Sequence, residues 1–363
     1  MGADFEVDSA ILDNGWRGRF ALIAEKPDAY AVFYKAGTTR PDVLIVTFST
    51  SYQDISSKPF AENFIRDEGF GHLHFSQAKN SDFQYLSLEE FQRIAAPYAQ
   101  GRTVITYGSS LGGYAAIFYA GTINARAIAA TPINLGHPLV AQPAKRTSVP
   151  IQHPEIIETP RSVHDPVILY DDEVSTDRLF VEACISPAYP TAKIHVIKHC
   201  GHGGALRILK EVGELKPVLL ALFEGRAVDL ATDDFTHRFQ DTHQYAMERA
   251  RFCLSHRMFG EAAQRARHLI ATHPSARVYQ ILIAALIKSD NRAEARRIYQ
   301  GVIGDFPELA RHFPTLAAGY RIGVRSALRH MAARFHGDAK SPFFRILKIM
   351  VNTGNYAVLL CLS

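Results

Sequence analysis

Residues 103–113 read Thr103-Val104-Ile105-Thr106-Tyr107-Gly108-Ser109-Ser110-Leu111-Gly112-Gly113. The β-branched and aromatic residues that open this stretch favour a strand, and the residues after it, Leu111–Ala120, favour a helix. Between the two lies the pattern Gly-x-Ser-x-Gly, whose glycines let a strand and a helix approach closely. The sequence therefore predicts a sharp strand-to-helix turn from which the hydroxyl of Ser110 stands clear.

Strands and helices alternate around this turn through the first two-thirds of the chain. Val43–Phe48 is a continuous apolar run, the pattern of a strand that is buried on both faces. Two more helices are expected at Leu88–Tyr98 and Thr176–Ile185. The other expected strands are Ala21–Glu25, Tyr30–Tyr34, Phe70–Phe75, Ala127–Ala130, Val167–Tyr170 and Ile194–Lys198. This alternation predicts an α/β fold, with a mostly parallel sheet and helices on both of its faces.

A serine hydroxyl is a weak nucleophile near neutral pH and needs a general base. His202 is our candidate, because Gly201-His202 lies in the loop that follows the last expected strand. His199, three residues earlier, is the competing candidate, whereas His195 lies within the strand itself and is expected to pack in the sheet.

The carboxylate that orients this histidine is expected after the preceding strand, Val167–Tyr170. Asp171 follows the strand directly, and Asp172 has the commoner spacing to the next helix. Both remain alternatives, with Asp171 slightly favoured. Asp177 is interpreted as a charge at the N-terminus of that helix, where the helix dipole favours an acid.

An acyl-transfer site also needs two backbone N–H groups that stabilise the negatively charged oxygen of the tetrahedral intermediate, the oxyanion hole. The residue after the nucleophile, Leu111, is expected to supply one of them. The turn after Val43–Phe48 is expected to supply the other, from Ser49 or Thr50.

The Gly-x-Ser-x-Gly turn, the acid loop and the histidine loop occur in the order that resembles the α/β-hydrolase superfamily. The resemblance covers about residues 18–225, inside an expected catalytic domain of residues 1–235. It implies a covalent acyl-enzyme, no metal and no organic cofactor. Most members of that superfamily hydrolyse esters, amides or thioesters, and some transfer the acyl group to another acceptor.

One segment of this domain departs from the alternation of strands and helices. Residues 134–166 contain six prolines, at positions 138, 143, 150, 154, 160 and 166. Proline disfavours a regular helix and a central strand. We expect this proline-rich insertion to form an irregular cap over the site.

Residues 241–363 differ from the rest in pattern and in charge. They contain 18 Lys and Arg against 8 Asp and Glu, whereas residues 1–240 contain 22 against 28. His256–Pro274 can be laid over Ser289–Pro307 at an offset of 33 residues, so that Glu261 meets Glu294 and Ala262 meets Ala295. The spacing resembles that of tetratricopeptide repeats and predicts a second, helical domain at residues 241–363.

The excess of arginine in this helical domain has two interpretations. Arg265 and Arg267, Arg296 and Arg297, and Arg321, Arg325 and Arg329 cluster at helical spacing. Solvated helix faces are the favoured interpretation, and a surface for a protein or an acidic partner is the alternative. Nucleic acid is not expected as a partner, because no recognised binding module accompanies the charge.

Composition excludes several classes of protein. With 47% hydrophobic and 21% charged residues the chain is of ordinary globular composition, and its apolar runs are too short for a membrane span. Four separated cysteines, with neither a CxxC pair nor an HExxH motif, predict reduced thiols in a cytoplasmic protein and no metal site.

The functional expectation is a serine hydrolase that cleaves an ester, thioester or amide of a small molecule or a glycan. Two alternatives stay open. One is an acyltransferase or deacetylase that acts on a glycan. The other is a non-catalytic adaptor whose helical repeats bind a protein partner.

Overall fold

The computed structural model describes residues 15–140 and 149–317 of the chain. Two further expected helices, one after Arg321 and one near Pro342–Val351, lie outside the described residues. The chain divides into two compact units, the first ending at Tyr245 and the second beginning at Ala246.

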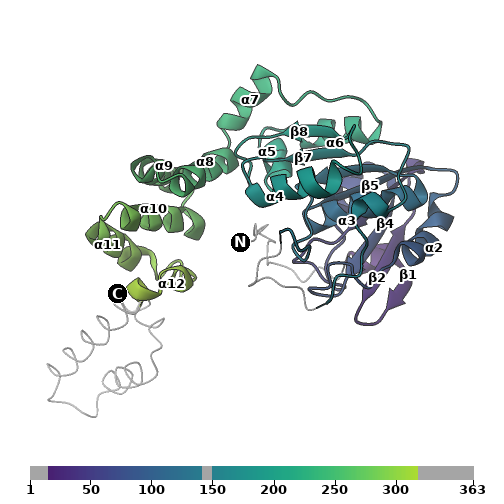
Figure 1. Ribbon diagram of the computed structural model, residues 1–363, viewed down its shortest axis with the longest axis horizontal. Helices are drawn as coiled ribbons and strands as arrows, with labels where there is room; N and C mark the ends of the chain where they lie inside the picture. Colours follow the sequence, from purple (N-terminus) through teal and green to yellow (C-terminus); the bar gives the residue numbers. More distant parts are fainter. Residues whose placement is uncertain (1–14, 141–148, 318–363) are drawn as a thin grey trace, which may run out of the picture. The chain divides into compact units, whose positions relative to one another are not determined.

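The first unit is built on one eight-stranded sheet with the order β1-β2-β4-β3-β5-β6-β7-β8 (Figure 1). The strands β1 and β2 form an antiparallel pair, β2 is antiparallel to β4, and the neighbours from β4 onward are parallel. The bounds are β1 Ala21–Lys26, β2 Tyr30–Lys35, β3 Arg40–Phe48, β4 Phe70–Gln77, β5 Thr103–Ser109, β6 Arg126–Ala130, β7 Val167–Tyr170 and β8 Lys193–Val196. The expected mostly parallel sheet is confirmed.

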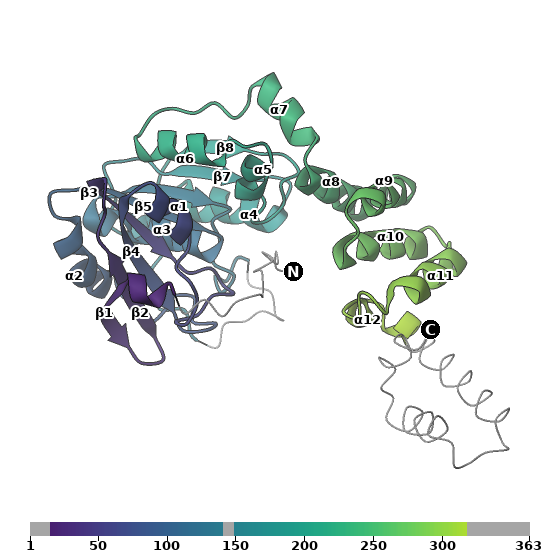
Figure 2. The same cartoon turned by 180° about the vertical axis from the view of Figure 1, so that it is seen from behind.

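Helices cover both faces of this sheet (Figures 1 and 2). One face packs against α2, Leu88–Ala99; α3, Leu111–Ala120; and α4, Ser175–Phe180. The opposite face packs against α1, Glu62–Asp67; α5, Ala205–Glu211; and α6, Leu215–Phe223. A further helix, α7, spans Asp233–Gln240. The expected helix Thr176–Ile185 is α4 followed by a π-helical turn, Val181–Ile185.

The central strand β3 shows how the sequence produces two cores. Its side chains alternate in direction, so Leu44, Val46 and Phe48 enter the core beneath α3, whereas Ile45 enters the core on the opposite face. Every residue of α3 is buried. A strand and a helix without a polar face occupy the middle of such a fold, and they fix the turn that joins β5 to α3.

Strands β3 and β4 also enclose a chain of buried polar side chains. The Thr47 hydroxyl lies 2.7 Å from His72 Nε2 and 2.8 Å from His74 Nδ1, and Ser49 Oγ lies 3.4 Å from His74 Nε2. Burial lowers the pKa of His74 to about 3. Burial lowers the pKa of His72 well below its usual value, and the nearby positive charge of Lys35 lowers it further. Both imidazoles are therefore neutral in the folded protein near neutral pH.

We expect acidification to destabilise the protein through these two histidines. A histidine whose pKa falls on folding binds fewer protons in the folded state than in the unfolded state. Its contribution is complete above the unfolded pKa of about 6.5 and is lost as the pH falls toward the folded value. At about pH 5 the loss from His74 alone is about 2 kcal/mol, and His72 adds to it.

Urea unfolding at about pH 7.5 and about pH 5 measures this loss. The matched variant is His74→Asn, whose amide takes the place of Nδ1 beside Thr47 and does not titrate. We expect the variant to lose less stability than the native protein between the two pH values. An equal loss in both proteins would contradict the assignment to His74.

The second unit consists of helices with their own core among the described residues. They are α8 His243–Ser255, whose first residues belong to the first unit, α9 Phe259–Thr272, α10 Ala276–Lys288, α11 Arg292–Val302 and α12 Leu309–His312. α10 packs against both α9 and α11. The residues paired by the 33-residue offset, Ala262 with Ala295, are both buried in this core. The likeness to tetratricopeptide repeats stays a prediction.

Candidate active site

Ser110 lies at the turn between β5 and α3 with a strained backbone. Its φ is 56° and its ψ is −122°, a conformation that residues other than glycine rarely adopt. Three backbone hydrogen bonds hold it there, because its N–H donates to Ala130 O and its carbonyl accepts from Ile133 N and Tyr114 N. The turn therefore fixes the direction in which the hydroxyl points.

The glycines of the motif are required by close contacts between backbones. A Cβ added to Gly108 would lie 2.1 Å from the carbonyl oxygen of Gly112, and one added to Gly112 would lie 2.8 Å from the carbonyl oxygen of Phe48. Gly113 has similar surroundings, 3.0 Å from Ala130 O. The pattern around Ser110 thus packs the start of α3 directly against the ends of β3 and β6.

His202 lies in the loop between β8 and α5, and its ring reaches Ser110. Its Nε2 lies 2.9 Å from Ser110 Oγ, within the range for a nucleophile and its base. The flanking Gly201 and Gly203 have φ values of 69° and 77°, which glycine adopts without strain. The Gly203 N–H donates to Thr131 Oγ1, so the loop is also tied to the end of β6.

The carboxylate beside His202 belongs to Asp177. Its two oxygens lie 2.9 and 3.0 Å from His202 Nδ1, and its side chain is buried in the first turn of α4. A protonated Nδ1 donating to Asp177 leaves Nε2 free to accept the Ser110 hydroxyl proton. The structure therefore aligns Ser110, His202 and Asp177 in one hydrogen-bonded row.

The prediction that Asp171 or Asp172 holds His202 is wrong, because the carboxylate hydrogen-bonded to His202 is that of Asp177. Asp171 is buried and accepts the N–H of Gly201 at 2.8 Å and the N–H of Glu173 at 3.1 Å, and burial raises the pKa of its carboxyl. Asp172 pairs with Lys198 at 2.6 Å. Asp171 thus holds the backbone of the histidine loop, and Asp172 belongs to a partly exposed ion pair.

The competing histidines are engaged elsewhere. His199 pairs with Glu173 at 2.6 Å, and its ring packs edge-on against Tyr245. His195 lies in β8, as expected. Neither one is the partner of Ser110.

The backbone N–H groups expected to form the oxyanion hole differ in whether they already have a hydrogen-bond acceptor. Leu111 is the first residue of α3, where a backbone N–H has no helical acceptor. The Ser49 N–H donates to Phe75 O and so continues the pairing of the sheet. The Thr50 N–H donates to Gln53 Oε1 at 2.9 Å. In this structure Ser49 is thus excluded as a donor, and Thr50 becomes available only when the Gln53 amide moves.

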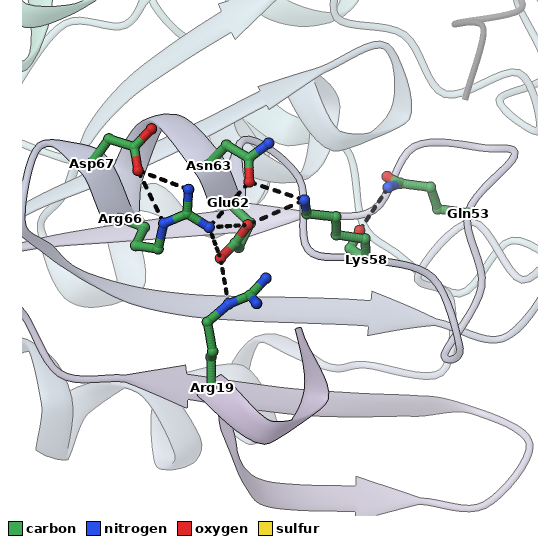
Figure 3. A network of polar contacts seen from close by, with 7 residues as sticks. All are labelled: Arg19, Gln53, Lys58, Glu62, Asn63, Arg66 and Asp67. Carbon is green, nitrogen blue, oxygen red and sulfur yellow. Dashed lines mark hydrogen bonds and ion pairs between the residues drawn. The ribbon is translucent and has the colours of Figure 1, made fainter. Parts of the chain in front are cut away.

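The loop after β3 is anchored by a network around Glu62 (Figure 3). Gln53 Nε2 donates to the Lys58 carbonyl. The buried Glu62 carboxylate lies 3.1 Å from Arg19 Nε, 3.2 Å from Lys58 Nζ and 3.2 Å from Arg66 Nη1. This network therefore couples Gln53, and through it Thr50, to the start of α1.

We expect Glu62→Ala to lower the free energy of unfolding by about 2 kcal/mol, because three cations lose their shared buried partner. The cations are themselves partly exposed, which keeps the loss below that of a fully buried pair. The matched control is Glu224→Ala, which removes the half-exposed partner of Arg226 and Arg40 and should change stability by less than about 1 kcal/mol. Urea unfolding measures both variants, and equal losses would show that the network does not stabilise the loop.

The described part of the proline-rich insertion packs on α3 through His153. The His153 ring stacks on Phe118 with 4.3 Å between ring centroids, and its Nδ1 lies 2.9 Å from the Tyr114 hydroxyl. Within the described residues of the insertion the helical element is a 3-10 turn at Ile156–Glu158. The insertion is therefore irregular where it is described, and it contacts the helix that begins after Ser110.

Two of the arginines predicted to cluster on the helical unit are paired. Arg265 contacts Glu261 at 2.8 Å and Arg267 contacts Glu294 at 2.7 Å. Arg296 lines a pocket of about 600 Å³ together with Arg292 and His312. Arg321, Arg325 and Arg329 lie outside the described residues.

None of the helices in the described ranges combines the length with the apolar character that crossing a bilayer requires.

Solved structures similar to this chain include several α/β hydrolases and esterases. An α/β-hydrolase enzyme from a metagenome of lagoon sediments at Mar Chica, Morocco, is 16% identical with a TM-score of 0.37, over 56% of this chain and 98% of its own. A structure from a study of carboxylesterases of the thaumarchaeon Nitrososphaera gargenis is 13% identical, with a TM-score of 0.40, over 56% and 99%. A monoglyceride lipase variant from Saccharomyces cerevisiae is 11% identical, with a TM-score of 0.36, over 58% and 96%.

No family model matches the chain, and no curated protein matches it. The likeness to these solved structures is distant, so it adds nothing to the argument about activity. The strand order and the strained turn at Ser110 are properties of this chain itself. They give its first unit an α/β-hydrolase-like fold.

Proposed function

We propose that the protein is a serine hydrolase that cleaves a carboxylic ester or thioester through an acyl-enzyme on Ser110. The observation that carries the proposal is the hydrogen-bonded row from Ser110 through His202 to Asp177. Each distance is within the range that proton transfer between positioned groups requires.

In the first step Ser110 Oγ attacks the carbonyl carbon of the substrate, and His202 Nε2 accepts the hydroxyl proton. The carbonyl oxygen gains the negative charge, which the Leu111 N–H and the N-terminus of α3 stabilise. The C–O or C–S bond then breaks, and His202 returns the proton to the departing alcohol or thiol. Asp177 holds Nδ1–H throughout and stabilises the imidazolium.

In the second step water attacks the acyl group on Ser110, and His202 again removes and returns a proton. The carboxylic acid leaves and the free hydroxyl is restored. The exposure of the site favours water as the acceptor, because 32% of the His202 side chain is accessible to solvent. Transfer to a sugar would need a site that excludes water.

A panel of aryl esters and thioesters of increasing acyl length tests the proposal. The predicted result is turnover that yields free acid in equal amount to the released alcohol or thiol. Adding glycan acceptors separates hydrolysis from transfer, since an acyltransferase would yield acylated sugar in place of free acid. Absence of any turnover by folded protein across both substrate classes would contradict the proposal.

A further inference from the structure

The peptide bond between Cys200 and Gly201, immediately before His202, is held on both sides. Its N–H, which belongs to Gly201, donates to Asp171 Oδ2 at 2.8 Å. Its carbonyl, which belongs to Cys200, accepts from Gln244 Nε2 at 2.8 Å. Asp171 and Gln244 are both buried, so two buried side chains fix the plane of this peptide.

The start of α8 places the Gln244 amide. Gln244 is the second residue of this helix, and its backbone N–H donates to Glu211 Oε2 at 3.2 Å, at the end of α5. The Gln244 side-chain oxygen accepts from Arg207 Nη1 at 3.4 Å. The amide therefore directs its nitrogen at the Cys200 carbonyl and its oxygen at a guanidinium, which is the orientation that suits both partners.

The next residue of α8 also contacts the histidine loop. The Tyr245 ring packs edge-on against His199 with 5.2 Å between ring centroids. His199 has a φ of 56°, a conformation that needs support from its surroundings. The Tyr245 N–H donates to Thr242 Oγ1 at 3.2 Å, which fixes the first turn of the helix. Neighbouring residues of α8 thus contact neighbouring residues of the loop.

We propose that Gln244 is a positioning residue for His202, a role that rests on the serine-hydrolase function proposed above. His202 directly follows the held peptide and Gly201, so a rotation of that peptide plane displaces the imidazole. The ring has to keep Nε2 at 2.9 Å from Ser110 Oγ and Nδ1 at 2.9 Å from Asp177. A displacement of about 1 Å can lower a rate by about 10²-fold.

This role extends the hydrolase site into α8. Gln244 lies 44 residues after Cys200 in the chain. The compact unit that contains Ser110 ends at Tyr245, so Gln244 belongs to it. A catalytic domain that ended at residue 235, as the sequence predicts, would lack the donor to the Cys200 carbonyl.

Gln244→Met in the full-length protein tests the proposal, because methionine keeps the length of the side chain but cannot donate to the Cys200 carbonyl. With an activated aryl ester, kcat should fall by about 10- to 100-fold. KM should stay near its native value, since Gln244 does not touch the ester.

Reaction with a fluorophosphonate separates positioning from a merely structural role. The Ser110 O–P bond forms, fluoride leaves, and His202 takes the hydroxyl proton. We expect the rate constant for this reaction in Gln244→Met to fall by about the same factor as kcat, with an end-point that stays at one adduct per protein. A reduced end-point with a native rate constant would overturn the proposal, because it would show only a loss of folded protein.

The matched control is Gln264→Met, the same substitution at an exposed position of α9, which should keep the native kcat and labelling rate. A native kcat in Gln244→Met also overturns the proposal. Should that variant not fold, Gln244→Glu decides the question. Its carboxylate has nearly the same shape but no donor, so a native kcat there would refute the role of Gln244. Failure of the proposed function is a different result, in which the native protein itself neither turns over the ester nor forms an adduct.

Discussion

Ser110→Ala is expected to lower kcat/KM for an activated aryl ester by roughly 10⁴-fold or more. The substitution removes the one atom that forms the covalent bond, while His202, Asp177 and the Leu111 N–H stay in place. Binding of the ester should change little, so the loss appears in kcat. Initial rates of the native protein and of the variant, measured at equal protein concentration over a range of ester concentrations, give kcat and KM for each.

The matched control is Ser109→Ala, a hydroxyl deletion at the preceding residue. Ser109 is buried at the end of β5 and belongs to the sheet. Its loss should leave most of the activity. The assignment fails if Ser110→Ala keeps native activity, or if a folded Ser109→Ala loses as much as Ser110→Ala.

Asp177→Asn is expected to have the second largest effect, a loss of roughly 10³–10⁴-fold in kcat. The amide has nearly the same shape but can donate a proton to His202 Nδ1. That hydrogen bond favours the tautomer with its proton on Nε2, which cannot accept the Ser110 proton. The variant should fold, so its loss of rate reports the tautomer.

Asp172→Asn is the matched control for this effect. It makes the same change five residues earlier in the chain, at a carboxylate whose partner is Lys198 at the surface. We expect it to keep most of the activity, since a partly exposed ion pair contributes about 0–1 kcal/mol. A larger loss in Asp172→Asn than in Asp177→Asn would contradict the arrangement described above.

The turn at Ser110 could be predicted because its causes are local. A run of β-branched residues, a glycine on each side of the serine and an apolar stretch without a polar face all lie within residues 103–120. The same holds for β3, whose apolar residues identify a strand buried on both faces. These features depend only on residues that lie close together in the sequence, so they can be predicted from the sequence alone.

The carboxylate that pairs with His202 could not be identified from the sequence, because burial in the folded protein decides which aspartate takes that place. Asp171, Asp172 and Asp177 all follow β7 and precede or open α4. An acid at the start of a helix is ordinarily a solvated charge, and Asp177 fits that pattern. Its complete burial against His202 depends on the path of the β8–α5 loop, about 25 residues further along the chain.

The central claim is that His202 and Asp177 activate Ser110, and a fluorophosphonate probe tests it most directly. The protein and its Ser110→Ala variant are each incubated with the probe, and their intact masses are measured. We expect one phosphonyl adduct on the native protein and none on the variant. A folded native protein without an adduct, or an equal adduct on Ser110→Ala, would contradict it, and the first of these results would favour an adaptor that keeps the hydrolase fold as a scaffold.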